Sequence, residues 1–404
     1  MSKIKNENDQ RLRVSPLRCF ILFIINPFVS FCDSLYSLAS NHNYTRKDYK
    51  FLFFIIALFL GVLAFTQKTD SGDICRIYKG VIYSNGNLEN VTSRFGSSLF
   101  NLTNILIYKL TGNVQYLSLF WVTLLYYLIF VSILNIFEYS GIKYSSRLLN
   151  YVVASILCFV IYTQVTEIMK QGIATSLFFY AFTNLINERK KIAIVSIVLS
   201  LGIHATAFFF LPLYFAVAIK NQRWLFILAM LSFLFRQFNL MGFIVSSFAG
   251  VGALSSLVDM ASGYNEKNIE NFFRSDGLYF TATFFMYFLY VLFVYIKSHS
   301  VFVRVCLLMI IVLNLNYGVS HNFTRLMTML FPFYIMLYLE LRKINTPIGV
   351  LATKFFLFAT FVFTVTLEYG RLASSSSYPT SFMDNSILKI IVSPLYIYLS
   401  TVCV

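Results

Sequence analysis

Charged residues are scarce in this 404-residue chain, in which Asp, Glu, Lys and Arg together make up only 12%. Soluble domains are about 25% charged and about 45–50% apolar, whereas 58% of this chain is hydrophobic. That composition excludes a soluble enzyme, a nucleic-acid-binding domain and a secreted disulfide scaffold. Because a membrane span takes roughly 20 apolar residues, the sequence predicts an all-α, polytopic integral membrane protein.

Acidic residues are the scarcer of the two charged classes, since 17 Asp and Glu stand against 32 Lys and Arg and give a net charge of +15. Membrane proteins concentrate such an excess in cytoplasmic loops, where it contacts anionic headgroups. We therefore expect the lipid bilayer, and no nucleic acid, as a partner. The six cysteines form no Cys-x-x-Cys pair, so neither a disulfide framework nor a zinc site is indicated.

Motifs of cofactor-dependent chemistry are also missing. The sequence has no P-loop, no Gly-x-Gly-x-x-Gly opening a helix and no His-Glu-x-x-His. We therefore expect no metal and no other cofactor. The substrate should arrive from within the membrane or from outside rather than from the cytoplasm.

Apolar runs separated by polar clusters predict about twelve transmembrane helices. These runs cover residues 51–66, 116–137, 149–163, 172–186, 192–219, 224–238, 241–258, 278–296, 301–317, 323–341, 348–367 and 387–402. The run 192–219 is long for one span and short for two. It contains Gly202 and Pro212, where a membrane helix could break.

Basic clusters give the predicted orientation. The clusters expected in the cytoplasm are Arg46-Lys47, Lys143 with Arg147, Arg189-Lys190-Lys191, Lys297 with Arg304, and Arg342-Lys343. Alternation places the larger periplasmic loops at about 67–115, 259–276 and 368–384, and short segments at 164–171 and 320–322. The turn 220–223 also falls outside, against the rule.

Two regions follow from this topology. Residues 1–50 form a basic, cytoplasmic N-terminal region with a possible interfacial or re-entrant helix at 17–39. Residues 51–404 form the polytopic transmembrane domain. Its first periplasmic loop contains a short amphipathic stretch at 99–110.

Ionisable residues beside the spans are candidates for function, because a charge near the middle of a membrane costs several kcal/mol unless it is paired or hydrated. Asp73 and Arg76 follow the first span, where they could hold a sugar hydroxyl and a phosphate. A solvated interfacial turn explains them equally well. Lys170 is either an anion ligand at the membrane entrance or the surface partner of Glu167, three residues before it.

Two histidines lie in or beside apolar runs. His204 is flanked by small residues, so it is either a packing histidine or a proton acceptor near neutral pH. His321 and Arg325 are four residues apart and share one helical face. The guanidinium could bind a diphosphate through two parallel hydrogen bonds, or it could snorkel to the interface.

The order of these motifs resembles that of the EpsG-like and Wzy-type polysaccharide polymerases of bacterial surface-glycan loci. The shared features are an early Asp-rich loop (73–78), a basic-Gln-Gly-Ile-Ala sequence (170–174), Ile-His-x-Thr-Ala (203–207), and Arg-Leu (325–326) before Phe-Pro (331–332). Together they cover about residues 68–341. The chain departs from the family pattern in two places: Lys170 stands where an arginine is expected, and the loop has Asp-Ile-Cys rather than Asp-Tyr.

This resemblance implies a GT-C-like membrane glycosyltransferase of the bacterial inner membrane that needs neither nucleotide sugar nor metal. Such an enzyme joins undecaprenyl-diphosphate-linked oligosaccharide repeat units on the periplasmic face into O-antigen, capsule or exopolysaccharide, and a chain-length regulator is a further potential partner. Under this hypothesis His204 or His321 is the base. The diphosphate is held by Arg325, Lys170 and Arg76, and Asp73 orients a sugar or Arg76.

Two other classes of protein fit the composition. A lipid-linked oligosaccharide flippase or transporter would be equally apolar and basic, but here the polar residues cluster at the outer ends of the spans rather than along a central path. A membrane acyltransferase that modifies a surface glycan would use one histidine as a base. Neither His204 nor His321 has an acid close to it in the sequence.

Overall fold

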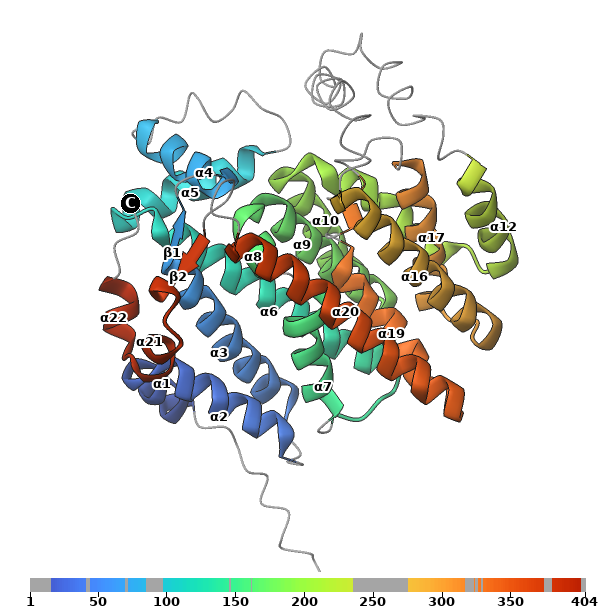
Figure 1. Cartoon of the computed structure of the whole chain (residues 1–404), viewed down its shortest axis with the longest axis horizontal. Helices are drawn as coiled ribbons and strands as arrows, with labels where there is room; N and C mark the ends of the chain where they lie inside the picture. The colour runs from blue at the N-terminus through green and yellow to red at the C-terminus, as the bar shows by residue number, and fades with distance from the viewer. Residues whose placement is uncertain are drawn as a thin grey trace, which may run out of the picture.

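A computed structural model of the chain describes residues 16–40, 44–69, 72–84, 97–144, 147–160, 162–234, 275–316, 323, 326–327, 330–373 and 380–400. Across these ranges the protein is helical except for one two-stranded ribbon, as Figure 1 shows. The prediction of an all-α protein is confirmed. The predicted span 241–258 and the predicted loop at 259–276 lie wholly or almost wholly outside the described residues.

Four of the described helices are long and apolar enough to cross a membrane, which marks the chain as a membrane protein. They are α3 (Arg46–Phe65), α6 (Gln115–Tyr139), α16 (Ser275–Lys297) and α20 (Pro347–Ala373). The count of twelve spans stays a prediction, because most other apolar runs are divided into shorter helices.

The shorter helices are distributed along the whole chain. They are α1 (Pro16–Ile25), α2 (Pro27–Ala39), α4 (Gly72–Tyr83), α5 (Ser98–Thr111), α7 (Arg147–Ala154), α8 (Tyr162–Glu167), α9 (Met169–Ile186), α10 (Lys190–Ile203), α11 (Phe215–Ala218), α12 (Gln222–Ser232), α17 (Val301–Leu315), α19 (Tyr334–Lys343), α21 (Ile387–Val392) and α22 (Leu395–Ser400). A π-helical turn covers Ser155–Phe159, and 3-10 helices cover Ala205–Tyr214, Phe331–Phe333 and Met383–Asn385. The strands are β1 (Gln67–Thr69) and β2 (Thr380–Phe382).

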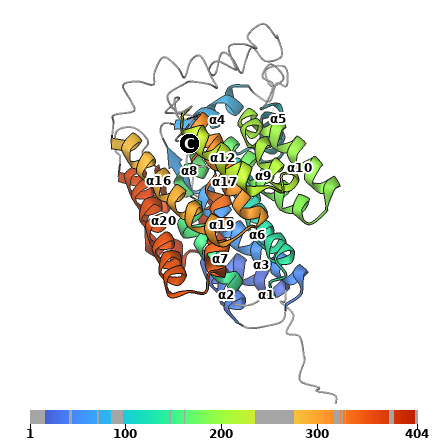
Figure 2. The same cartoon turned by 90° about the vertical axis from the view of Figure 1, so that its right-hand side faces the viewer.

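Helices α3, α6, α9 and α10 pack side by side in that order. At the crossing of α3 and α6, a Cβ added to Gly61 would lie 2.0 Å from Thr123 Oγ1 and 2.6 Å from the Leu119 carbonyl oxygen. Only glycine allows this approach, as is common where membrane helices pack closely. In Figures 1 and 2 the helices α4 and α5 lie at one end of this bundle, the outer end, and α1 and α2 lie toward the other, the inner end.

The long apolar run 192–219 is divided into separate helices and does not form one continuous helix. Helix α10 ends at Ile203, and His204 adopts an extended conformation (φ −154°, ψ 132°) that breaks the helix. The chain continues as the 3-10 helix Ala205–Tyr214, which contains Pro212. A proline has no amide hydrogen to donate to an α-helix, so the sequence favours a break in this run.

Contacts place the turn 220–223 at the inner end, beside segments that are predicted to be cytoplasmic, whereas alternation of the predicted spans puts it outside. Gln222 Nε2 donates to the Ser298 carbonyl oxygen at 3.0 Å. Phe302, four residues on from Ser298, has its ring centroid 5.6 Å from that of Tyr139 at the end of α6. This basic turn thus lies at the same end as the other basic segments, as the charge rule expects.

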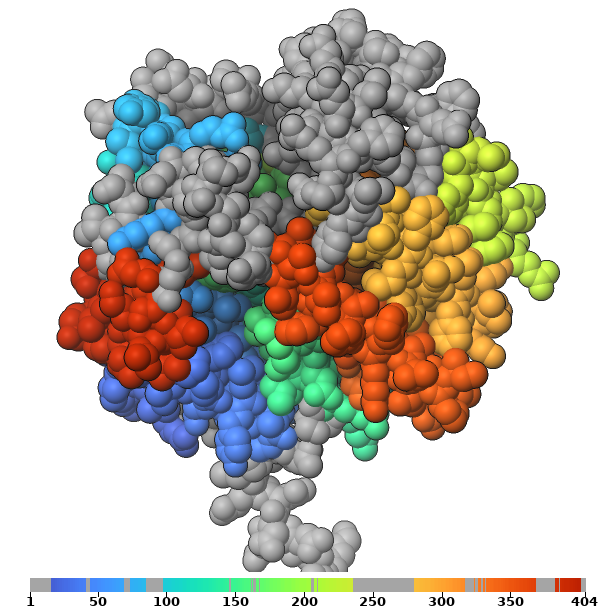
Figure 3. Space-filling view, viewed as in Figure 1, coloured from blue at the N-terminus to red at the C-terminus, as the bar shows by residue number. Residues whose placement is uncertain are grey.

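The N-terminal apolar stretch forms a hairpin of two helices, each shorter than the roughly 20 residues of a span. Arg18 bonds Asp33 at 2.8 Å, so α2 folds back along α1. Asn26 caps α2 at the turn and donates from Nδ2 to the Ile391 carbonyl oxygen at 2.8 Å. Figure 3 shows the C-terminal segment beside these helices. That the hairpin is interfacial or re-entrant stays a prediction.

One carboxylate holds three segments together at the inner end. Glu138 bonds Arg46 at 2.6 Å and Arg189 at 2.7 Å, and both guanidinium groups also donate to Asn135 Oδ1. The Tyr144 hydroxyl donates to Glu138 at 3.1 Å, and burial together with this carboxylate raises the pKa of Tyr144 to about 12. Two basic segments are thereby fixed to the end of α6.

We expect Glu138→Gln to destabilise the protein by about 1–3 kcal/mol, because hydrogen bonds to charged groups are lost and two cations keep no carboxylate. Thermal unfolding in detergent would measure the change. Glu188→Gln is the matched control, since Glu188 is exposed at the same end and a surface change costs less than about 0.5 kcal/mol. Equal melting temperatures for the two variants would contradict the proposed role of Glu138.

Candidate functional site at the outer end

The first predicted periplasmic loop contains two helices, α4 and α5, that lie on the outer end of the bundle (Figure 1). The predicted amphipathic stretch at 99–110 is confirmed as α5. Helix α4 buries Ile74, Tyr78 and Val81, the spacing of one helical face. The Tyr78 hydroxyl shares a buried hydrogen bond with Ser118 of α6, which fixes α4 to the bundle.

Asp73 and Arg76 lie on the first turn of α4, where they form an i, i+3 ion pair. The Arg76 side chain is 77% exposed and that of Asp73 is 32% exposed. Asp73 thus contacts Arg76, while most of the guanidinium stays exposed. An exposed pair of this kind contributes little to stability.

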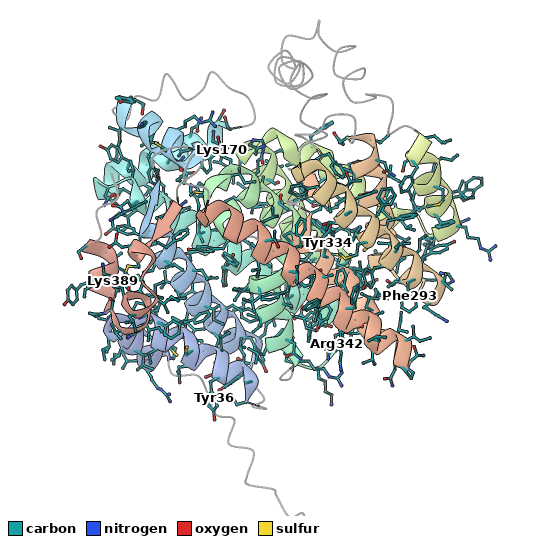
Figure 4. All side chains as sticks on the ribbon, viewed as in Figure 1. Tyr36, Lys170, Phe293, Tyr334, Arg342 and Lys389 are labelled. Carbon is teal, nitrogen blue, oxygen red and sulfur yellow. The ribbon has the colours of Figure 1, made fainter. Side chains whose placement is uncertain are left out.

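Lys170 lies in the first turn of α9, half-buried at the outer end (Figure 4). Its Nζ lies 5.4 Å from the centroid of the Phe100 ring in α5, which is within the range of a cation–π contact. Phe100 is fully buried and stacks on Trp121 at 5.1 Å, and Trp121 Nε1 donates to Asn104 at 2.7 Å. A rigid aromatic layer thus supports the lysine.

The charge of Lys170 adds to the positive end of a helix. Helix α9 begins at Met169, and the N-terminal end of a helix carries a positive partial charge, so this position favours an anion. Gly172 brings the turn close to its neighbours, because a Cβ there would lie 2.7 Å from Val165 Cγ1 and 2.8 Å from Leu125 Cδ1. A larger residue in place of this glycine of the Lys-Gln-Gly sequence would therefore require both side chains to shift.

His204 lies at the end of α10, half-buried. Ser200, one turn earlier, donates from Oγ to the Ala174 carbonyl oxygen of α9 at 2.6 Å. Gly202 faces α5, where an added Cβ would lie 3.4 Å from Leu99 Cβ. Leu99 and Phe100 are consecutive, so α5 contacts both the segment that carries His204 and the side chain of Lys170.

The other two candidates, His321 and Arg325, lie outside the described residues. Their neighbour Phe323 is buried, with its ring centroid 5.8 Å from that of Phe284 in α16. Leu326 and Met327 are also buried. The structure thus brings Lys170 and His204 together around α5 and pairs Asp73 with Arg76, all at the outer end.

A feature that the sequence analysis missed is the ribbon formed by β1 and β2, which joins the segment after α3 to the segment after α20. The strands are antiparallel, with Gln67 opposite Phe382. Asp384 lies just beyond β2 and bonds Lys68 at 2.6 Å and Lys389 at 2.8 Å. Hydrogen bonds from Lys389 and Lys68 lower the pKa of Asp384 to about 2.

Because the pKa of Asp384 is lower in the folded protein than its ordinary value of 3.8, its ion pairs stabilise the ribbon above about pH 4 and are lost as the pH falls toward about 2. We expect the difference in melting temperature between wild type and Asp384→Asn to be constant from about pH 8 to about pH 5, to shrink below about pH 4 and to vanish below about pH 2. A difference that disappears near pH 6 would show that another group controls the ribbon.

Comparison with known proteins identifies a family. A model of the EpsG family matches residues 49–382, which is more than four-fifths of the chain. The matched region runs from the first turn of α3 to the end of β2 and includes the segments that carry Asp73, Lys170 and His204. No curated protein and no solved structure matches the chain.

Proposed function

Because the chain belongs to the EpsG family, we propose that it is a membrane glycosyltransferase with a GT-C-like architecture. It polymerises undecaprenyl-diphosphate-linked oligosaccharide repeat units into a surface polysaccharide. The family match is the observation that carries this proposal. The grouping of Lys170, His204 and the Asp73–Arg76 pair at one end of the bundle supports it.

The proposed reaction joins two lipid-linked glycans. A hydroxyl of the acceptor unit attacks the anomeric carbon of the donor chain, a new C–O bond forms, and the bond to the diphosphate breaks with its electron pair. Undecaprenyl diphosphate leaves, and the proton of the hydroxyl passes to a base. The reaction requires no nucleotide sugar and no metal.

The residues take separate roles in this scheme. His204 or His321 accepts the proton, which is general base catalysis. Lys170, Arg76 and Arg325 stabilise the charge that develops on the departing diphosphate, and Asp73 orients Arg76 or a sugar hydroxyl. A cation on the leaving group and a base on the acceptor are the two functions that the chemistry needs.

The basic residues at the inner end indicate how the protein is oriented in the membrane. Arg46 and Arg189 lie at the inner end with Glu138, and cytoplasmic segments carry such basic residues. We place the outer end on the periplasmic face of the bacterial inner membrane, where the lipid-linked units are joined. The partners that this proposal requires are the lipid-linked glycan and the bilayer, and a chain-length regulator is a further potential partner.

A gel of surface glycan from the host with and without this gene tests the proposal. Loss of a polymerase should collapse the ladder to core plus a single repeat unit. Loss of even the single unit would indicate a flippase or an earlier step. An unchanged ladder with altered acetyl content would indicate an acyltransferase.

A further inference from the structure

Gln67, the first residue of β1, has a side-chain amide buried without hydrogen bonds. Only 1% of the residue is exposed, and neither Nε2 nor Oε1 has a partner in the part of the chain that the structure describes. Among the described residues, Gln67 is the only side-chain amide whose nitrogen and oxygen are both buried without a hydrogen-bond partner. Buried polar atoms are nearly always paired, and each exception calls for an explanation.

Burial at the outer end does not by itself leave a glutamine unpaired. Gln115, at the start of α6, is also 1% exposed. Its Nε2 donates to the Phe65 carbonyl oxygen at 2.8 Å, and its Oε1 accepts from Asn113 at 3.4 Å. The contrast between the two glutamines indicates that the hydrogen-bond partner of Gln67 is not among the described residues of the protein.

The surroundings of Gln67 show which chemistry that partner has. Gln67 pairs with Phe382, and directly opposite residues of two strands point to the same face. The Phe382 ring centroid lies 5.2 Å from that of Tyr162 in α8. Lys68 alternates to the other face of the strand, where it bonds Asp384. The face that carries Gln67 is thus neutral and aromatic.

We propose that Gln67 binds a hydroxyl group of the oligosaccharide repeat unit, with the Phe382 and Tyr162 rings as the adjoining apolar surface; this inference rests on the proposed function. An amide offers two donors and an acceptor, which match a hydroxyl that both donates and accepts. A phosphate presents acceptors alone and is better matched by the cations of the site. Gln67 is therefore a sugar-binding residue rather than a diphosphate ligand.

The ribbon that carries Gln67 is short and has to lift for a sugar to reach the buried amide. It contains three residue pairs, and a two-stranded ribbon is at best marginally stable alone. Its ion pairs join Asp384 to Lys68 and Lys389, whose side chains are 42% and 54% exposed, and exposed pairs contribute little. Lifting the ribbon exposes the amide to the sugar.

The test measures binding of the lipid-free repeat-unit oligosaccharide, released by mild acid from the host's lipid-linked intermediate, to the purified full-length protein. Gln67→Met removes both polar ends at similar length. The Kd should rise about tenfold, as expected for the loss of one or two hydrogen bonds, while the melting temperature stays equal or rises. In the control variant Gln115→Met the melting temperature should fall, with the Kd unchanged.

An unchanged Kd in Gln67→Met, or no binding of this oligosaccharide to wild type, would overturn the inference. If the methionine variant does not fold, Gln67→Asn gives the same comparison, because it keeps the amide but withdraws it by one methylene. A polymerisation assay on the same protein separates the two proposals. If wild type forms polymer and the Kd of Gln67→Met is unchanged, only the role of Gln67 is refuted. If Gln67→Met binds the glycan more weakly but wild type forms no polymer, only the polymerase activity is refuted.

Discussion

Replacing Lys170 by methionine should lower the rate of polymerisation by about 100-fold, the effect of removing one group that stabilises charge in a transition state. The side chain lies on the buried Phe100 ring at the positive end of α9, where it can stabilise the departing diphosphate. Polymer length and the release of undecaprenyl diphosphate in proteoliposomes would measure the change. Lys170→Arg should keep most of the activity, since the cation is retained and the family pattern has arginine there.

The control for this result is Lys79→Met. Lys79 is an exposed lysine of α4 at the same end of the bundle, so its loss removes an equal charge without touching the support on α5. Wild-type rates in Lys79→Met together with a large loss in Lys170→Met would locate the effect at Lys170. Equal losses in both variants would mean that the outer end attracts the substrate only through its overall charge.

Replacing His204 by glutamine should reduce kcat by about 100-fold to 10,000-fold, the usual contribution of a general base. The KM should change little, because the histidine acts on a proton and not on the diphosphate. The measurement is the initial rate at several concentrations of lipid-linked repeat unit. Melting temperature would report whether α10 still ends correctly at residue 204.

His299→Gln is the matched control for this variant. His299 is exposed between α16 and α17 at the inner end, so its replacement should leave kcat unchanged. A full rate in His204→Gln would exclude His204 as the base and leave that role to His321. A raised KM with an unchanged kcat would instead assign His204 to substrate binding.

Most of the local structure at the outer end could be predicted from the sequence. The amphipathic stretch at 99–110 becomes α5, and the run 172–186 becomes the body of α9. The ion pair of Asp73 with Arg76 follows from their spacing of three residues on one helix. These features depend on residues close together in the chain.

Contacts between distant segments could not be predicted in this way. The pairing of Gln67 with Phe382 joins residues more than 300 positions apart, and no periodicity in a local stretch encodes it. The same holds for Lys170 on Phe100. The unpaired state of Gln67 becomes visible only when its whole surroundings are known, because the sequence shows merely a polar residue after an apolar run.

The position of the turn 220–223 could not be predicted for a similar reason. Residues 192–219 contain enough apolar residues for one long span, and hydropathy alone does not distinguish a tilted helix from two short passes. The extended backbone at His204 shows that the run is not one continuous helix. The break also puts His204 at a turn at the outer end, and not in the middle of a helix.

The most direct test of the proposed polymerase activity is to incubate the purified protein in proteoliposomes with undecaprenyl-diphosphate-linked repeat units alone, without nucleotide sugar or added metal. The proposal predicts chains of two or more units and the release of one undecaprenyl diphosphate for every linkage formed. Movement of intact units between leaflets without chain growth would contradict it and would identify a flippase.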